Sequence, residues 1–378
     1  MRIHFNASEL SSLGIEWELE LVDLRTGELS AGADEILAEL APAEGVEHPK
    51  AKHELLQSCV EVITGVCTTV AQARADLAGT VAEVQAAAAK RDLGVLCSGT
   101  HPTTRWSTQR ISAGERYRML VERNQRMAQQ LQIFGVHVHV GVRAVDKVIP
   151  IVNALLDYVP HFLALSASSP FWLGGDTGLA SYRSKVFEGL PTAGLPYQLH
   201  DWDEFEHYME LLIKTRAIET VREVWWDIRP HPDFGTVELR ICDGLPTLDE
   251  VTAVAAMAQC LVEQMDGQLD RGYQLPEPRA WVVRENKWRA ARYGLDAEIV
   301  VDARGTVRPV RAAIHDLIDD LTPTARRLGC EDELALVPRI LEHGASYQRQ
   351  RRVAASAGGE LRPVVDALLE EMRVGLPL

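Results

Sequence analysis

The sequence of 378 residues lacks the marks of a secreted, disulfide-stabilised or membrane protein. It contains only six cysteines, none of them in a CxxC pair, and its N-terminus has no apolar signal-peptide region. Its apolar runs are interrupted within a dozen residues, whereas a membrane-spanning helix needs about 20 apolar residues. We therefore expect a cytoplasmic protein with no membrane partner, whose cysteines are reduced thiols in the core.

Positive charge is also scarce, and several well-known catalytic motifs are missing. Lys and Arg number 39 against 54 Asp and Glu, which leaves a net charge of −15. A field of that sign repels nucleic acid, although a local basic patch could still hold a phosphate ligand. The chain has no GxxxxGK(S/T) motif, which excludes Walker-type ATP binding, and no GxGxxG motif after a strand. The absence of HExxH and GxSxG motifs weakens a metalloprotease or serine hydrolase interpretation.

What the sequence does contain is a period-2 alternation of apolar and polar residues in several short segments. In residues 14–23, for example, Ile15, Trp17 and Leu19 alternate with glutamates, so that one face of a strand is apolar and the other acidic. Such patterns predict strands at 14–23, 57–65, 135–142, 225–230 and 236–242, with a hairpin turn at 231–235. Helical spacing of apolar residues predicts helices at 68–93, 144–168, 201–222, 248–270, 309–328, 331–342 and 360–374. Because no repeat or linker divides the chain, we expect one α+β domain over residues 1–378, an antiparallel sheet with helices on one face.

The polar faces of these strands carry the candidate chemistry. They comprise Glu16, Glu18, Glu20, Glu61, His137, His139, Glu238 and Arg240, with Asp227 and Arg229 beside them. Clustered carboxylates repel one another unless a cation lies among them. An oxygen-rich set with an imidazole suits Mg²⁺ or Mn²⁺ better than zinc. Taken alone, the polar face of any one strand also fits a solvated face or an ordinary cross-strand charge pair. The strands at 14–23, 135–142 and 236–242 together favour a site.

These residues fall within a series of motifs that resembles the type 2 glutamate–cysteine ligases, also called carboxylate-amine ligases, and most closely their actinobacterial members. In order, the motifs are LGIEWELELVD (13–23), HELLQSCVEVITGVC (53–67), GTHPTTRWS (99–107), IFGVHVHVGV (133–142), LALSASSPFW (163–172), SYR (181–183), PTAGLPY (191–197), GTVELRICDG (235–244), ENKWRAARYGLDA (285–297) and GASYQRQ (344–350). The resemblance implies a glutamine-synthetase-like fold, in which an antiparallel sheet forms a funnel packed with helices. It also implies ATP-dependent amide formation through an acyl phosphate, with glutamate as the usual acid and cysteine or another amino acid as the amine.

The resemblance further implies roles for individual residues. The ligands of Mg²⁺ would be Glu16, Glu18, Glu54, Glu61, His137 and Glu238. Arg240 and Arg183 are suited to a substrate carboxylate or the transferring phosphoryl group. His139 could be a ligand, a proton acceptor or a structural neighbour. Candidate ATP contacts are Lys287, Arg289 and Arg292, unless they form a solvated helix face. Arg349 is a weaker site candidate.

Two of these expectations depend on local geometry, and other functions stay open. Glu54 precedes Glu61 by seven residues, so both reach one face only if a bulge or loop lies between them. Trp17 lies on the opposite parity from the glutamates and is expected in the core. A guanidino-kinase-like phosphotransferase, a ligase for other acids or amines, and a binding protein without catalysis are the alternatives. A homo-oligomer such as a dimer is expected from the family.

Overall fold

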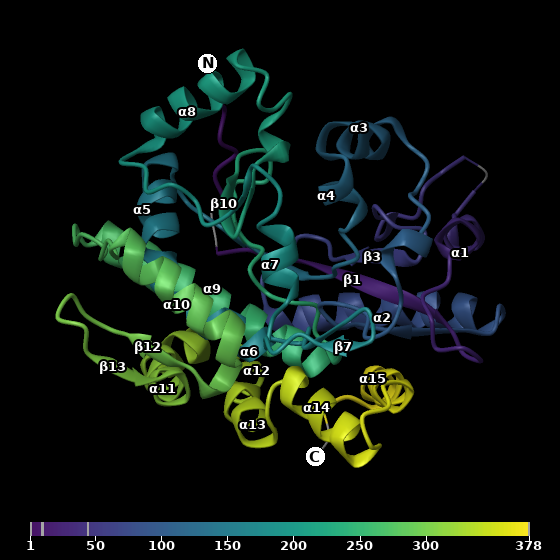
Figure 1. Ribbon diagram of the computed structural model, residues 1–378. Helices are drawn as coiled ribbons and strands as arrows, with labels where there is room; N and C mark the ends of the chain where they lie inside the picture. Colours follow the sequence, from purple (N-terminus) through teal and green to yellow (C-terminus); the bar gives the residue numbers. More distant parts are fainter. Residues whose placement is uncertain (1, 9–10, 44, 377–378) are drawn as a thin grey trace.

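A seven-stranded antiparallel sheet lies at the centre of the fold (Figure 1). The computed structural model describes residues 2–8, 11–43 and 45–376. The strands of the sheet are β1 (Leu13–Asp23), β2 (Ala51–His53), β3 (Cys59–Ile63), β4 (Leu93–Leu96), β5 (Val136–Gly141), β10 (Ile228–His231) and β11 (Thr236–Leu239). Their order is β10–β11–β5–β1–β3–β2, and β4 pairs with the second half of β1. Every segment predicted as a strand therefore contains one.

Strand β1 shows how the alternation divides the sheet into two faces. The side chains of Ile15, Trp17 and Leu19 are buried against helices, and the Trp17 indole N–H donates a hydrogen bond of 3.0 Å to the carbonyl oxygen of Leu245. The intervening glutamates point to the opposite face. The prediction that Trp17 belongs to the core is confirmed.

The hairpin between β10 and β11 depends on a glycine. The two strands pair antiparallel, as predicted for 231–235, and Gly235 in the turn has a positive φ of 66°. A β-carbon on Gly235 would collide with the carbonyl group of Asn6, so only glycine fits there.

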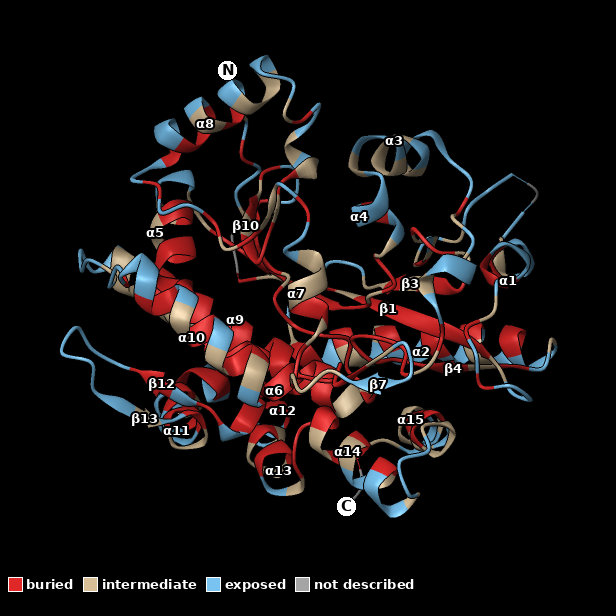
Figure 2. Cartoon of the chain, in the orientation of Figure 1, coloured by how far each residue is buried: buried red, intermediate tan, exposed pale blue. Residues whose placement is uncertain are grey.

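Helices lie on both sides of the sheet, and those on its apolar face form two layers. In chain order the helices are α1 (Ala33–Leu40), α2 (Val70–Ala89), α3 (Glu115–Asn124), α4 (Arg126–Gln129), α5 (Val145–Leu155), α6 (Val159–Ser166), α7 (Arg183–Phe187), α8 (Trp202–Lys214), α9 (Leu248–Asp270), α10 (Ala280–Tyr293), α11 (Val310–Leu328), α12 (Glu331–Leu334), α13 (Leu336–His343), α14 (Ser346–Ser356) and α15 (Arg362–Val374). Helices α2 and α9 pack on β1, α9 also packs on β5, and α5 packs on β10 and β11. A second layer of α6, α11, α12 and α13 packs against α9, and its inner parts are buried (Figure 2).

Several predicted helices differ from those in the structure. The segment 201–222 is helical only to Lys214 and then forms a short 3₁₀ turn at Val221–Glu223, which Thr220 caps. The segment 331–342 consists of two helices, α12 and α13. Helices α1, α3, α4, α7, α10 and α14 were not predicted as elements. Three short two-stranded sheets were also missed; they are formed by β6 (Phe171–Trp172) with β7 (Gly175–Asp176), β8 (Ala193–Gly194) with β9 (Trp225–Trp226), and β12 (Glu298–Val300) with β13 (Val307–Pro309).

One apolar stretch is longer than the sequence suggested. Residues Val145–Ser166 span 22 residues and are apolar enough to cross a membrane by length and composition. In the fold, 83% of the most apolar window is buried inside the protein. The stretch is also broken by a 3₁₀ turn, after which Pro160 begins α6, while Pro150 lies inside α5. It therefore packs as two core helices.

All six cysteines are buried, which confirms their place in the core. Cys260 on α9 and Cys330 before α12 approach each other with 3.6 Å between their sulfur atoms. Burial raises the pKa of Cys59, Cys97 and Cys242, so these thiols stay protonated and unreactive.

Arg349 has a structural position rather than one in the polar face of the sheet. Its guanidinium lies 2.9 Å from carboxylate oxygens of both Glu250 on α9 and Glu371 on α15, and it donates a 2.6 Å hydrogen bond to the carbonyl oxygen of Gly344. Glu250 is completely buried, and its backbone N–H donates a hydrogen bond to the side-chain oxygen of Thr247, the residue that caps α9. Arg349 therefore neutralises a buried charge and ties the C-terminal helices to the core.

Replacing Arg349 by methionine should lower the free energy of unfolding by about 3 kcal/mol or more, because the Glu250 carboxylate would be left buried without a counter-charge. Urea unfolding measures this change. Arg326→Met is the matched control, since the exposed Arg326–Glu331 pair at 2.9 Å should contribute less than about 1 kcal/mol. Arg349→Met/Glu250→Gln should recover part of the loss. Equal losses in Arg349→Met and Arg326→Met would contradict the structural role of Arg349.

Candidate active site

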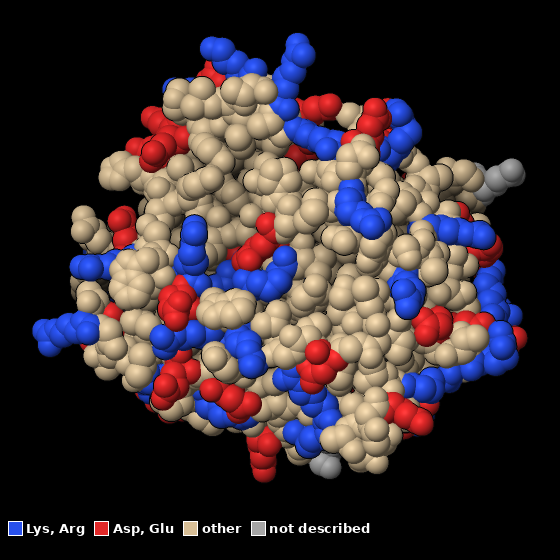
Figure 3. Space-filling view, in the orientation of Figure 1, with Lys and Arg blue, Asp and Glu red and all other residues tan. Residues whose placement is uncertain are grey.

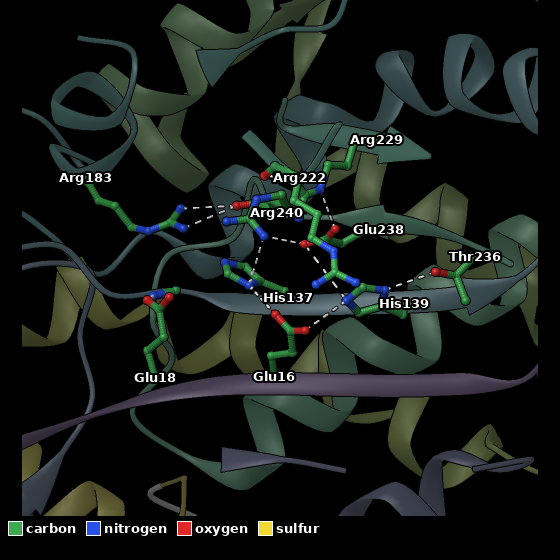
Figure 4. A network of polar contacts seen from close by, with 11 residues as sticks. Glu16, Glu18, His137, His139, Arg183, Arg222, Arg229, Thr236, Glu238 and Arg240 are labelled. Atoms are coloured by element: carbon green, nitrogen blue, oxygen red, sulfur yellow. Dashed lines mark hydrogen bonds and ion pairs between the residues drawn. The ribbon is translucent and has the colours of Figure 1, made fainter. Parts of the chain in front are cut away.

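The strand register brings the polar side chains of β1, β3, β5 and β11 together on the face of the sheet opposite α2 and α9 (Figure 4). In the β1–β5 pair, Glu16 lies opposite His137, and in the β1–β3 pair, Glu18 lies opposite Glu61. Because side chains of residues directly opposite each other stand on the same face, both pairs project into one region. One oxygen of Glu16 lies 2.9 Å from Nδ1 of His137, and the other lies 3.2 Å from Nε2 of His139.

The neighbouring strands add the arginines. In the β11–β5 pair, Glu238 lies opposite His139, and in the β10–β11 hairpin it lies opposite Arg229. Glu238 is fully buried and accepts a 2.6 Å hydrogen bond from Nε of Arg229 on one oxygen and a bond from Arg240 on the other. Arg240 also reaches to 3.4 Å from Nδ1 of His137.

Glu16 and Glu238 form the part of the cluster in which negative charge is compensated. Burial alone would raise the pKa of each carboxyl group, but the surrounding cations and donors outweigh it. His137 and His139 hold the pKa of Glu16 well below its usual value, and Arg229 with Arg240 does the same for Glu238. Both carboxylates are therefore ionised throughout the physiological pH range.

Glu18, Glu54 and Glu61 form a second part in which negative charge is not compensated. Burial and the neighbouring Glu54 raise the pKa of Glu18 to about 8. Burial, together with other carboxylates, also raises the pKa of Glu61 well above its usual value, and burial raises that of Glu54. The shifts favour the protonated form of all three carboxyl groups, because burial disfavours their charge and the nearby arginines do not outweigh it.

Glu54 reaches this region because the chain turns between β2 and β3. Strand β2 ends at His53, and residues 54–58 form a turn before β3 begins at Cys59. The bulge or loop that the spacing of Glu54 and Glu61 requires is therefore present. The side chain of Tyr117 on α3 supports the turn by donating a 2.9 Å hydrogen bond to the carbonyl oxygen of His53.

The donor atoms fit a hard divalent cation. Ligand atoms of Glu18, Glu61 and His137 lie within 4.8 Å of one another, and so do those of Glu16, His137 and Glu238. His137 is shared by the two sets. Burial lowers the pKa of His137 to about 4, and its Nε2 atom is buried without a hydrogen-bond partner in the described part of the chain. With Nδ1–H donating to Glu16, this Nε2 lone pair is available to a metal.

The structure narrows the role of His139. Although burial opposes its positive charge, Glu238 and Glu16 raise the pKa of the imidazole above its usual value. Nδ1 lies 3.0 Å from the hydroxyl oxygen of Thr236, and Nε2 lies 3.2 Å from Glu16. These two contacts occupy both ring nitrogens, so the geometry favours a positioning role for His139 over metal ligation.

Arg183 approaches the cluster from α7. Its two terminal nitrogens donate hydrogen bonds of 3.3 Å to the carbonyl oxygen of Arg240, and its Nε is buried without a partner in residues 2–8, 11–43 and 45–376. A β-carbon on Gly135 would collide with the guanidinium. Gly135 is thus required for Arg183 to lie beside Glu18, whose carboxylate accepts a 2.5 Å hydrogen bond from the Gly135 N–H.

Comparison with known proteins decides the family. The family model of glutamate–cysteine ligase family 2 matches residues 12–367. The chain belongs to this family. A protein of Frankia casuarinae, named provisionally as glutamate–cysteine ligase 2-1, is 62% identical over 100% of this chain and 99% of its own length. A protein of Thermobifida fusca, named provisionally as glutamate–cysteine ligase 2, is 53% identical over 100% of this chain and 94% of its own.

Solved structures show the same fold at low sequence identity. The glutamate–cysteine ligase of Francisella tularensis, solved in complex with AMP, has a TM-score of 0.69 and 13% identity over 99% of this chain and 91% of its own. A bifunctional glutathione synthetase from Pasteurella multocida has a TM-score of 0.70 and 14% identity over 96% of this chain and 52% of its own. The expected glutamine-synthetase-like α+β fold is confirmed, and family membership makes the chain a carbon–nitrogen ligase.

The basic residues on α10 of this family 2 ligase have partners outside the carboxylate cluster. Lys287 is buried, with its Nζ 2.6 Å from Asp227 and 2.5 Å from Glu188. Arg289 pairs with Glu285 at 2.7 Å, and Arg292 donates to the carbonyl oxygen of Gly178. Basic and acidic side chains are likewise interspersed over the face drawn in Figure 3. A nucleotide contact by these residues stays a prediction.

Two aromatic groups at the rim of the site were missed. His231 and Phe234 stack with ring centroids 4.1 Å apart, and both rings meet the edge of His139. They belong to the segment HPDFG, whose composition predicts only a turn. Arg229, noted only as a neighbour of the cluster, is a direct partner of Glu238.

Binding of Mg²⁺ should release protons and strengthen between about pH 6 and pH 8, because the raised pKa of Glu18 must be overcome before its carboxylate can ligate. Titration calorimetry in two buffers of different ionisation enthalpy measures the released protons. Glu61→Gln should bind Mg²⁺ more weakly, whereas the exposed control Glu342→Gln should match the parent protein. Binding that does not depend on pH would contradict this assignment.

Proposed function

We propose that this protein joins the γ-carboxyl group of glutamate to the amine of cysteine or another amino acid at the expense of ATP. The family assigns the class of ligase, and the polar face of the sheet offers a place for its chemistry. The residue roles, the resident Mg²⁺, a single domain over residues 1–378, a homo-oligomeric assembly and a cytoplasmic location are parts of this proposal.

The observation that carries the proposal is the cluster of three carboxyl groups, Glu18, Glu54 and Glu61, beside a histidine on one face of the sheet. Their pKa values are raised chiefly by burial, and the unpartnered Nε2 of His137 lies beside two of them. Buried carboxylates without counter-charges destabilise a fold, so such a cluster is expected only where a cation compensates it. The oxygen-rich donor set fits Mg²⁺.

A bound Mg²⁺ would supply positive charge that stabilises the negative charge developing during phosphoryl transfer. The residues that would hold it are Glu18, Glu61 and His137, with Glu16 and Glu238 on the other side of His137. Arg240 and His139 face the same region, and Arg240 supplies positive charge from the protein itself. Arg183, fixed on the backbone of Arg240, is placed to orient a substrate carboxylate.

The proposed reaction has two steps. The γ-phosphoryl group of ATP passes to a carboxylate oxygen of the acid, and ADP leaves. The nitrogen lone pair of the amine then attacks the acyl carbon, phosphate departs with that carboxylate oxygen, and the nitrogen loses a proton as the amide forms. Positioning and electrostatic stabilisation are sufficient for both steps, so no nucleophile from the chain is required.

Incubation with Mg-ATP, glutamate and a panel of amines should release ADP only when both the acid and an acceptor amine are present. Mass spectrometry should detect a product equal to the sum of acid and amine less water. A phosphorylated small molecule in place of the amide would instead establish the phosphotransferase alternative. Absence of turnover with any acid tested, despite intact ATP binding, would contradict the proposal.

Glu238→Gln should reduce the rate of ADP release by about 100-fold or more, because Arg229 and Arg240 would lose the charge that positions them. Thermal unfolding checks that the variant stays folded. Glu342→Gln on the exposed surface of α13 serves as the matched control and should keep the parental rate. Full turnover by a folded Glu238→Gln protein would show that the Glu238 carboxylate is not needed for catalysis.

A further inference from the structure

A buried aspartate joins three of the sequence motifs at one point behind the polar face of the sheet. Asp243 follows β11 in the motif GTVELRICDG, is 0% exposed, and its backbone pairs with that of Gly135 next to β5. Its carboxylate contacts serines of the motifs LALSASSPFW and SYR. Asp243 is not among the groups proposed above to hold Mg²⁺ or to contact a substrate, so its burial requires another explanation.

Three donors hold the Asp243 carboxylate. One oxygen accepts hydrogen bonds of 3.0 Å from the backbone N–H of Ser168 and 2.7 Å from the hydroxyl group of Ser169. The other oxygen accepts a 2.8 Å hydrogen bond from the hydroxyl group of Ser181. All three serines are buried. Gly99 leaves the room for this arrangement, since a β-carbon there would lie 2.7 Å from the carboxylate.

Ser169 connects Asp243 to the first residue of α7, which is Arg183. The hydroxyl group that donates to Asp243 also accepts a 3.0 Å hydrogen bond from the backbone N–H of Arg183. The backbone of Ser169 is fixed on the same segment, because its N–H donates to the carbonyl oxygen of Ala180 and its carbonyl oxygen accepts from the N–H of Tyr182. Asp243 thus orients the hydroxyl group that holds the start of α7.

The guanidinium group of Arg183 has few contacts of its own. Its terminal nitrogens donate two long hydrogen bonds of 3.3 Å to the carbonyl oxygen of Arg240, and its Nε has no partner among the described residues (Figure 4). Burial raises the pKa of the Asp243 carboxyl group, and the charge of Arg183 is the largest effect that opposes this rise. The direction of the guanidinium therefore depends on where α7 begins and on the nearby negative charge.

We propose that Asp243 is a positioning residue that sets how tightly Arg183 binds the carboxylate of an amino-acid substrate. The inference rests on the proposed function, in which Arg183 orients such a carboxylate. A guanidinium binds a carboxylate by two parallel hydrogen bonds, whose geometry is lost when the group shifts or turns. Binding of ATP, by contrast, does not depend on Asp243.

Asp243→Asn and Ser169→Ala interrupt the connection at two places with little change in volume. Each should raise the KM of one amino-acid substrate by about tenfold, as the loss of one charge-assisted hydrogen bond predicts, and leave the KM of ATP within about twofold of the parental value. Steady-state rates of ADP release measure both constants. A fall in kcat with both KM values unchanged, or a rise in the KM of ATP, would overturn the proposal.

Arg183→Lys tests whether the effect passes through Arg183. Lysine keeps the charge but cannot bind a carboxylate by two parallel hydrogen bonds, so the KM of the same substrate should rise. The double variant Ser169→Ala/Arg183→Lys should then have a KM within about twofold of that of Arg183→Lys alone, because both changes remove one interaction. Effects that multiply would show that Ser169 and Arg183 act independently and would contradict the proposal.

Asp266→Asn is the matched control, because it neutralises another buried aspartate. Asp266 on α9 pairs with Arg143 at 2.8 Å and with Lys147 at 2.7 Å. Its loss should lower the midpoint of thermal unfolding without changing either KM. Thermal unfolding of Asp243→Asn and Ser169→Ala confirms that the kinetic constants refer to folded protein.

A measurement without turnover separates this inference from the proposed function. The Nε–H resonance of Arg183 in a ¹H–¹⁵N spectrum is identified by its loss in Arg183→Lys. It should shift or broaden in Ser169→Ala and Asp243→Asn and stay unchanged in Asp266→Asn. An unchanged resonance in the first two variants would overturn the positioning role, whether or not the protein is an active ligase. A shifted resonance in a protein without turnover would support that role and contradict the proposed function alone.

Discussion

Repulsion between buried carboxylates is the constraint on which the rest of the site depends. Glu16, Glu18, Glu61 and Glu238 meet on one face of the sheet because alternation and register leave them no other place, and Glu54 joins them from the turn before β3. Burying one such charge without compensation costs several kcal/mol. In one half, Arg229, Arg240 and His139 outweigh burial and hold the pKa of Glu238 low, whereas in the other half burial and neighbouring carboxylates raise the pKa of Glu61. The carboxylate cluster therefore lowers the stability of the fold at a place where a bound cation would restore it.

The positive groups around this face are themselves fixed by partners. Arg183 is held by the backbone of Arg240 and by the space that Gly135 leaves open, and Lys287 is held by Asp227 and Glu188. Such pairs set the direction from which a guanidinium or ammonium group faces the cluster. They also mean that contact of Lys287 with a nucleotide requires it to exchange partners.

Much of the fold could be predicted because local patterns were strong. The alternation in β1 and β5 and the capped apolar stripe of α9 each identify an element without reference to the rest of the chain. Elements such as α7 and α14 were missed since they are short or polar, and tertiary contacts rather than amphipathic pattern maintain them. Arg349 illustrates the same limit: its position among polar residues of α14 gave no sign that Glu250 lies beside it.

The sequence by itself determined which side chains share a face, because a strand repeats every two residues, and its motifs determined the family. Only the tertiary structure decided how those side chains divide into charged and protonated groups. That division depends on which strands are neighbours and on their register, since the pKa of Glu238, opposite Arg229, is lowered, whereas the pKa of Glu61, opposite Glu18, is raised.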